Sequence, residues 1–138
     1  MAHEVRNPFD DSLIDTVPEA TEQDVRDAIS RAAAVKQTMA SMPAHRRASI
    51  LYKVSELIET NASEIATLMA RESGKPMRYA KGEVARAVET FAFAAEEARR
   101  IHGETIPLDA AKGGVGKIGY YMRVPVGVVA AITPFNFP

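Results

Sequence analysis

One neutral amide near the carboxyl end of the chain has the surroundings of a catalytic group. Asn136 lies between two phenylalanines and follows Thr133-Pro134. Before it, residues 126–132 form an apolar run with the length and β-branched content of a strand buried on both faces. Pro134 ends such a strand because proline has no N–H for a ladder. Open α/β sheets bind ligands in the loop after a buried strand, so Asn136 is a candidate hydrogen-bond donor to a substrate.

The same stretch resembles a segment of the NAD(P)-dependent aldehyde dehydrogenase superfamily that reads Pro-x-Gly-Val-x-x-x-Ile-x-Pro-(Trp/Phe)-Asn-(Phe/Tyr)-Pro. The positions that match are Pro125, Gly127, Val128, Ile132, Pro134, Phe135, Asn136, Phe137 and Pro138. The resemblance implies that Asn136 stabilises the negative oxygen formed when a cysteine thiolate adds to an aldehyde. The residues it implies for the channel of an NAD or NADP cofactor are Ile132, Thr133, Pro134 and Phe135. The alternative interpretation of Asn136 is an amide that caps its own turn.

The composition fits a folded protein without a nucleic-acid or membrane partner. The 138 residues are 46% hydrophobic and 25% charged, with a net charge of −1. This balance argues against disorder, and the near-zero charge gives no electrostatic attraction to nucleic acid or an anionic membrane. No stretch reaches the roughly 18 apolar residues of a membrane span, and the first residues have no secretion signal. We therefore expect a cytoplasmic protein.

The chain has no cysteine. This excludes disulfides, thiolate metal sites and a cysteine nucleophile from these residues. Aldehyde dehydrogenases are several times longer than one domain and carry their catalytic cysteine downstream of the Asn136 motif. The resemblance therefore implies the N-terminal portion of a longer oxidoreductase, inactive by itself, whose complete form oxidises a small aldehyde to a carboxylic acid through a cysteine thiohemiacetal. No metal site is expected.

The middle of the chain predicts four helices in succession. Thr21-Glu-Gln-Asp24 is a capping box and Asn61-Ala-Ser-Glu64 a second helix start, while Gly74 and Gly103 are expected helix ends. The last helix should extend from about residue 77 to 101, with alanines that allow close packing. A short hairpin around the turn residues Asn7-Pro8 should precede them.

After residue 103 the pattern changes to β structure. Residues 105–108 and 118–124 predict two strands around a glycine-rich loop. An isolated hairpin is marginal in water, so this one needs a partner. By resemblance, residues 104–125 form an oligomerisation hairpin that would build a homodimer or homotetramer. The alternative is a hairpin that folds back on its own chain.

The expected fold is α/β in three parts. Residues 1–103 would hold the N-terminal hairpin and the helices of a cofactor-binding domain, and residues 104–125 the oligomerisation hairpin. Residues 126–138 would supply the first strand and active-site loop of a Rossmann-like sheet.

Two other functions compete with this interpretation. Lys112-Gly-Gly-Val-Gly-Lys117 is close to a phosphate-binding loop of partitioning-type ATPases. It lacks the hydroxyl residue that binds magnesium, because Ile118 occupies that position. The residues after the loop are predicted to form a strand, whereas a phosphate-binding loop is followed by a helix. A stand-alone helical interaction module is the second alternative. Lys75, in a Glu-Ser-Gly-Lys-Pro turn that the family shares, is interpreted as a solvated residue after a helix end.

Overall fold

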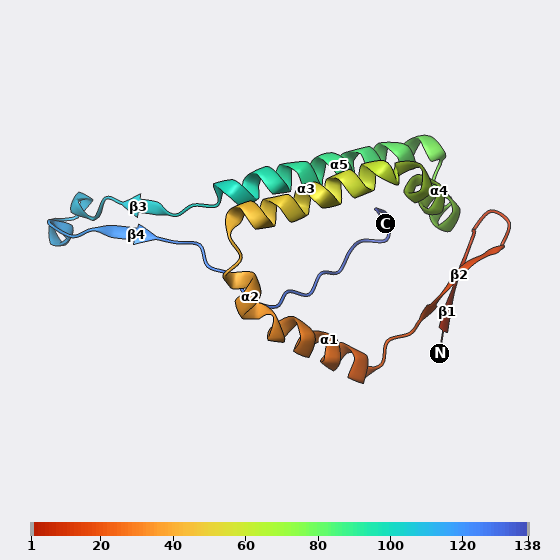
Figure 1. Ribbon diagram of the computed structural model, residues 1–138, viewed down its shortest axis with the longest axis horizontal. Coiled ribbons are helices and arrows are strands. Elements are labelled where there is room, and N and C mark those ends of the chain that lie inside the picture. Colours follow the sequence, from red (N-terminus) through yellow and green to blue (C-terminus); the bar gives the residue numbers. More distant parts are fainter. Residues whose placement is uncertain (1, 138) are drawn as a thin grey trace.

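The computed structural model describes residues 2–137, and within them it contains five α-helices, two short 3-10 helices and two antiparallel hairpins (Figure 1). The elements in chain order are β1 (Ala2–Arg6), β2 (Leu13–Pro18), α1 (Glu22–Ala34), α2 (Lys36–Ala40), α3 (Ala44–Thr60), α4 (Ala62–Ser73), α5 (Met77–Arg100), β3 (Glu104–Ile106), η1 (Leu108–Ala110), η2 (Lys112–Gly114) and β4 (Gly119–Tyr121). None of the helices in this part of the chain is both long and apolar enough to cross a membrane.

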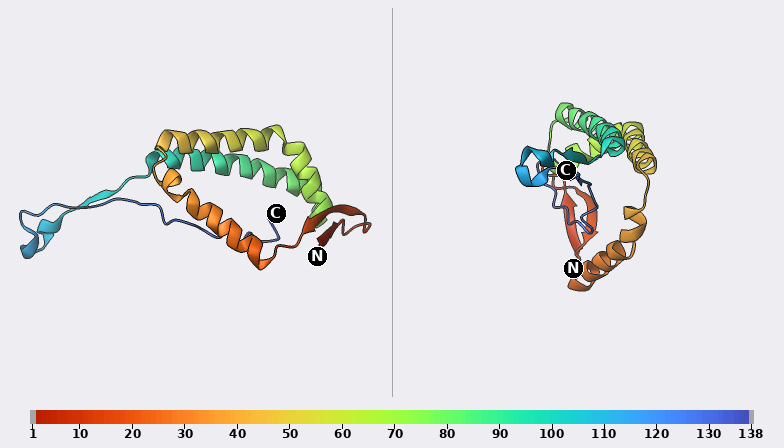
Figure 2. Two further views of the ribbon diagram at one scale, coloured as in Figure 1. Left: turned by 60° about the horizontal axis from the view of Figure 1, so that its bottom comes forward. Right: turned by 90° about the vertical axis from the view of Figure 1, so that its left-hand side faces the viewer.

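The helices α3 and α5 lie side by side, and α4 packs across one end of the pair (Figures 1 and 2). Alanines make the close contacts: Ala48 on α3 and Ala95 on α5 have no exposed surface. Such small side chains let two helix backbones approach closely. Ser55 of α3 adds a polar link, since its hydroxyl donates a hydrogen bond to the carbonyl of Val88 on α5 at 2.8 Å. The β3–β4 hairpin follows directly from the end of this pair, after Arg100 of α5.

The largest buried side chains lie where α4 meets α5. Met69 and Val84 are 6% and 2% exposed and contact the fully buried alanines Ala66 and Ala80. The apolar positions of both helices recur at helical spacing, which brings one face of each helix to this contact. The cluster fixes α4 against the first half of α5, and it thereby also fixes the turn between them.

The sequence predicted one helix from the Thr21 capping box to about Pro43, and the structure has the two helices α1 and α2 there. The capping box at its start is confirmed, because the Thr21 hydroxyl accepts the Asp24 N–H and the Asp24 carboxylate accepts the Thr21 N–H. The helical dihedrals stop at Val35, where α1 ends and α2 begins. Neither α1 nor α2 has a buried residue, so no packing contact stabilises one continuous helix here. Val35 at the break is half-exposed, and its β-branched side chain lowers the helix propensity of this position.

Gly74 and Asn61 were both predicted to lie at helix boundaries, and only Gly74 has the predicted role. Gly74 is confirmed as a left-handed end of α4, with φ of 68°. Asn61 does not cap α4: its side-chain amide donates to the Leu57 carbonyl at 2.7 Å and thus closes α3. The linker between α3 and α4 is a single residue, so the Asn61 amide serves the free carbonyls of the preceding helix.

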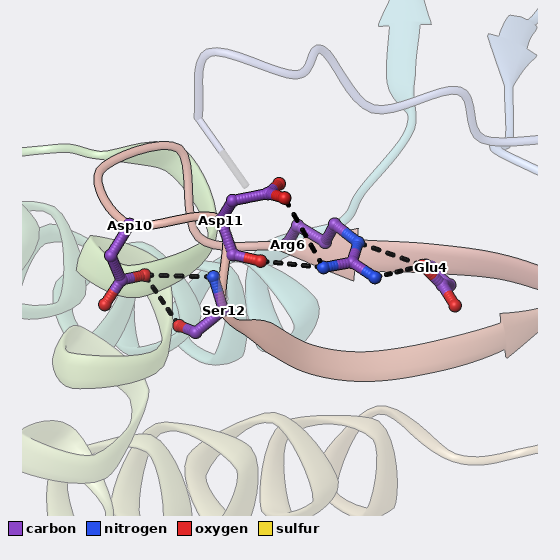
Figure 3. Close-up of polar contacts among 5 residues, drawn as sticks. All are labelled: Glu4, Arg6, Asp10, Asp11 and Ser12. Carbon is purple, nitrogen blue, oxygen red and sulfur yellow. Dashed lines mark hydrogen bonds and ion pairs between the residues drawn. The ribbon is translucent and has the colours of Figure 1, made fainter.

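The N-terminal hairpin is confirmed, and its turn is held by charged hydrogen bonds (Figure 3). Arg6 donates to the Glu4 carboxylate at 2.7 and 2.9 Å and to the Asp11 carbonyl at 2.7 Å, and these acidic neighbours raise the pKa of Arg6. Asp10 accepts from the hydroxyl and N–H of Ser12, which lowers the pKa of Asp10. The two aspartates thus serve the turn itself.

The second hairpin, β3–β4, projects away from the helices at the end opposite to β1–β2 (Figures 1 and 2). Its strands are three residues each, with Glu104 opposite Tyr121. The sequence predicted Gly103 as the C-terminal cap of α5, but the cap is Ile101, and φ of Gly103 is not positive. Gly103 is needed instead because a Cβ there would lie 1.7 Å from the Tyr121 carbonyl oxygen. The close approach of the two hairpin stems therefore requires glycine.

Residues 122–134 have no assigned strand, which corrects the prediction of a buried strand at 126–132. The segment is extended, and its apolar side chains face solvent: Val126 is 88% and Ile132 95% exposed. A strand is defined by its ladder of hydrogen bonds, and within residues 2–137 no other strand lies beside this segment. The apolar pattern is present, but residues 2–137 provide no strand that would bury it.

Candidate functional site

The extended C-terminal segment carries Asn136 to the first turns of α5. After leaving the β3–β4 hairpin it passes α2, where Gly127 has a φ of 102° and its Cβ position lies 3.6 Å from Cε of Lys36 (Figure 1). Only glycine adopts this backbone conformation without strain. Farther along, the Phe137 N–H donates to the Pro134 carbonyl at 3.4 Å, which marks a turn. Asn136 is therefore presented on a turn beside the helices.

A partly buried lysine fixes this turn to the helices. Lys75 lies in the short connection between α4 and α5, and its ammonium group is 2.5 Å from Oε2 of Glu83 on α5. The same ammonium donates to the backbone carbonyl of Asn136 at 3.0 Å. The side chains of the ion pair are 18% and 12% exposed. The backbone of residue 136 is thereby tied to the helical part of the molecule.

The ring of Phe137 lies against two cations. The Lys75 ammonium is 5.3 Å and the Arg86 guanidinium 5.6 Å from the ring centroid. Both distances are within the range at which an aromatic face attracts a cation. The aromatic residue after Asn136 thus adds a second attachment of the turn to α5.

The carbonyl of Asn136 is engaged, whereas its side-chain amide is exposed and forms no hydrogen bond within residues 2–137. Asn136 lines two open cavities. The first, of about 470 Å³, is also lined by Lys75, by Phe137 and by residues of α5 that include Glu83 and Arg86. The second, of about 650 Å³, reaches toward Val5 and Phe135. An amide in this position is available to a molecule that enters either cavity.

The four predicted cofactor residues lie together on the segment that leads to this turn. They are exposed, with Ile132 at 95% and Phe135 at 93%, and Thr133 and Pro134 lie between them. Two large apolar side chains in solvent provide a surface on which a flat ring could pack. The five predicted site residues are consecutive in the sequence, and the structure places the last of them, Asn136, beside α5.

Lys75 follows the end of α4, as predicted, but the prediction that it is solvated was wrong, because its side chain is only 18% exposed. Its partner Glu83 and the neighbouring Arg86 were not singled out by the sequence either. Glu83 is eight positions away from Lys75, which is not a spacing that helical periodicity brings together. Only the fold, with Pro76 starting α5 directly after Lys75, places the two side chains in contact.

The glycine-rich loop at 112–117 is the tip of the β3–β4 hairpin. Residues 112–114 form η2, and the N–H groups of Gly114 and Lys117 donate to carbonyls within the loop. The next element is the strand β4. A phosphate-binding loop needs free N–H groups and a helix N-terminus at this point, so the geometry does not favour a nucleotide site here.

Comparison with known proteins confirms the family that the sequence resembles. The sequence model of the aldehyde dehydrogenase family matches residues 1–138. Aspartate-semialdehyde dehydrogenase 1 of Pseudomonas canavaninivorans is 40% identical over 98% of this chain, and so is 3-sulfolactaldehyde dehydrogenase of Priestia aryabhattai. The chain spans 29% and 28% of the length of these relatives.

Solved structures show the same similarity in three dimensions. Aldehyde dehydrogenase 21 of Physcomitrella patens, crystallised with its reaction product succinate, superposes with a TM-score of 0.94 at 40% identity over 100% of this chain. The NADP complex of glyceraldehyde-3-phosphate dehydrogenase from Bacillus halodurans gives a TM-score of 0.92 at 34% identity over 99% of this chain. Each match covers 29% of the solved chain. The protein belongs to the aldehyde dehydrogenase family.

Proposed function

We propose that residues 1–138 are the N-terminal part of an enzyme that oxidises a small aldehyde to a carboxylic acid with NAD or NADP, and that Asn136 donates a hydrogen bond to the reacting oxygen. One observation supports this most strongly. In a chain of this family, the backbone of Asn136 is tied to the helices through Lys75, while its side-chain amide is left free at two open cavities.

The proposed chemistry needs a donor at the point where negative charge develops. A cysteine thiolate of the complete enzyme would form a carbon–sulfur bond to the aldehyde carbon, and the carbonyl π electrons would move onto oxygen. Loss of hydride from that carbon would restore the C=O bond and give a thioester, which water would cleave to the carboxylate and the thiol. Asn136 would stabilise the negative oxygen through its side-chain N–H, and an amide has no titrating charge of its own.

The residues present fit a nicotinamide cofactor at the segment before Asn136. Ile132 and Phe135 are apolar and exposed, and Thr133 and Pro134 offer backbone groups between them. These four residues would hold the cofactor, which when bound would accept the hydride. Relatives with solved structures include both NAD- and NADP-dependent enzymes, so either nucleotide is proposed.

We also propose that the β3–β4 hairpin joins subunits into a homodimer or homotetramer. It projects from the helices, and the apolar side chains on and beside β4 are exposed, with Ile118 at 88% and Met122 at 70% (Figure 1). Replacing residues 104–123 by a short Gly-Ser turn should convert the complete enzyme to monomers in analytical ultracentrifugation. Unchanged assembly would contradict this role.

Turnover of an Asn136→Ala variant tests the proposed function. Reduced nicotinamide formation would be followed in the complete enzyme with a semialdehyde substrate, because relatives act on aspartate and malonate semialdehydes. Loss of one oxyanion donor lowers kcat by roughly a hundredfold to a thousandfold. The matched control is Asn7→Ala, in the N-terminal turn, which should keep normal turnover. Normal turnover of Asn136→Ala would sink the proposal.

A further inference from the structure

The chemistry proposed above does not use the ion pair beside Asn136. The side chains of Lys75 and Glu83 are 18% and 12% exposed, and Oε1 of Glu83 is buried without a hydrogen-bond partner among residues 2–137. Taking two charges out of water is costly, and a buried ion pair usually contributes little net stability. A pair that is only partly satisfied is better explained by the geometry it imposes than by the stability it adds.

That geometry is imposed on residue 136 itself. Lys75 donates to the backbone carbonyl of Asn136 at 3.0 Å, and the same ammonium lies 5.3 Å from the centroid of the Phe137 ring. Glu83 holds the ammonium from the other side at 2.5 Å, and it does so from α5, which packs against α3 and α4. The chain of contacts therefore leads from the packed helices to the backbone that carries the candidate oxyanion donor.

We propose that Lys75, held in place by Glu83, is a positioning residue that orients the Asn136 amide. The inference rests on the proposed function of Asn136. A reacting group that is misplaced by about 1 Å can lose on the order of a hundredfold in rate. Without Lys75, the turn keeps its contact with Arg86 and its own hydrogen bond, so we expect a partial loss of about tenfold in kcat.

A double-mutant cycle in the complete enzyme separates positioning from a general structural role. Lys75→Met should lower kcat about tenfold and Asn136→Ala about a hundredfold or more, while the double variant should match Asn136→Ala alone. The effects are non-additive because Lys75 acts only through the amide. Lys81→Met, at an exposed lysine on the helix that also carries Glu83, is the control and should keep normal kcat.

A variant with both charges removed controls for misfolding caused by an unpaired buried charge. Lys75→Met alone leaves the Glu83 carboxylate buried without its cation, whereas Lys75→Met with Glu83→Gln leaves no unpaired charge. This neutral pair should show the same tenfold loss in kcat. Hydrogen exchange of the Phe137 amide, which donates to the Pro134 carbonyl, should become about tenfold faster, as the loss of one charge-assisted hydrogen bond implies. The Lys81→Met control should exchange like the parent enzyme.

The outcomes distinguish this inference from the function on which it rests. Normal turnover of Asn136→Ala would overturn both. If Asn136→Ala is slow but Lys75→Met and the neutral pair turn over normally, only the positioning role is overturned. The same conclusion follows if the Lys75 and Asn136 losses multiply in the double variant, since Lys75 would then act independently of the amide.

Discussion

Replacing Gly103 by alanine should unpair the β3–β4 hairpin while leaving the helices intact. A Cβ at this position would lie 1.7 Å from the carbonyl oxygen of Tyr121, and real Cβ contacts are essentially never shorter than 3.0 Å. The two stems must therefore separate by more than an ångström. The position of Cβ is fixed by the backbone, and the atom it meets is a backbone carbonyl oxygen, so no side-chain rotation relieves the clash. Overpacking of this kind costs about 1–3 kcal/mol.

That cost falls on a ladder with little stability of its own. Each strand of the hairpin has three residues, and the pair nearest the clash is Glu104 with Tyr121. Two-stranded hairpins are marginal in water, and about 2 kcal/mol changes an equilibrium by roughly thirtyfold. The hairpin of the Gly103→Ala variant should thus be mostly open. Its site lies beyond the last turn of α5, so the unfolding of the helices should be unaffected.

Amide hydrogen exchange of residues 104–106 and 119–121 measures the opening. The matched control is Gly113→Ala, at the hairpin tip, where a Cβ would have no atom within 4 Å. Exchange in this hairpin should become about thirtyfold faster in Gly103→Ala and stay unchanged in Gly113→Ala. Equal protection in the two variants would refute the argument that close backbone approach requires glycine at residue 103.

Three further predictions concern stability. Ser55→Ala should cost about 1 kcal/mol in urea denaturation because the hydrogen bond to the Val88 carbonyl is lost; no change in the midpoint would show that this link contributes nothing. Gly74→Ala should lower the free energy of unfolding by about 1 kcal/mol, because Gly74 has a positive φ. Gly82→Ala within α5 should raise it by a similar amount, because Gly82 has no positive φ and open space around its Cβ position. Equal shifts in the two variants would contradict this. Hydrogen bonds from Thr21 lower the pKa of Asp24, so the cap stabilises α1 at neutral pH. This stabilisation is lost as the pH falls below about 3.8 and through the lowered pKa. If the helicity of Asp24→Asn followed the same acid profile, the role of the Asp24 carboxylate in the cap would be contradicted.

The sequence predicted those features that depend on residues close together along the chain. The capping box at Thr21, the left-handed end at Gly74 and the hairpin turn near Asn7 were recognised because each depends on residues a few positions apart. The break at Val35 was missed because it reflects the lack of packing around α1 and α2. Asn61 was assigned to the wrong helix because one amide can serve either neighbour, and only the geometry decides.

Long-range contacts could not be predicted in this way. The contact between Lys75 and Asn136 joins residues 61 positions apart, and no local spacing indicates it. Residues 126–132 show the converse case. Their apolar pattern correctly indicates an extended backbone, but a strand also needs partners, and the described chain offers none. The family motif located Asn136, whereas the fold shows how the backbone beneath the amide is held.

When an aldehyde is bound, the Asn136 amide should point at the oxygen of the substrate. A crystal structure of the complete enzyme with a covalent aldehyde adduct would measure the distance from Nδ2 of Asn136 to the substrate oxygen. We expect about 2.7–3.1 Å, with the Lys75 ammonium still bonded to the Asn136 carbonyl. An amide that faces solvent, with the substrate oxygen bound by other donors, would contradict this expectation.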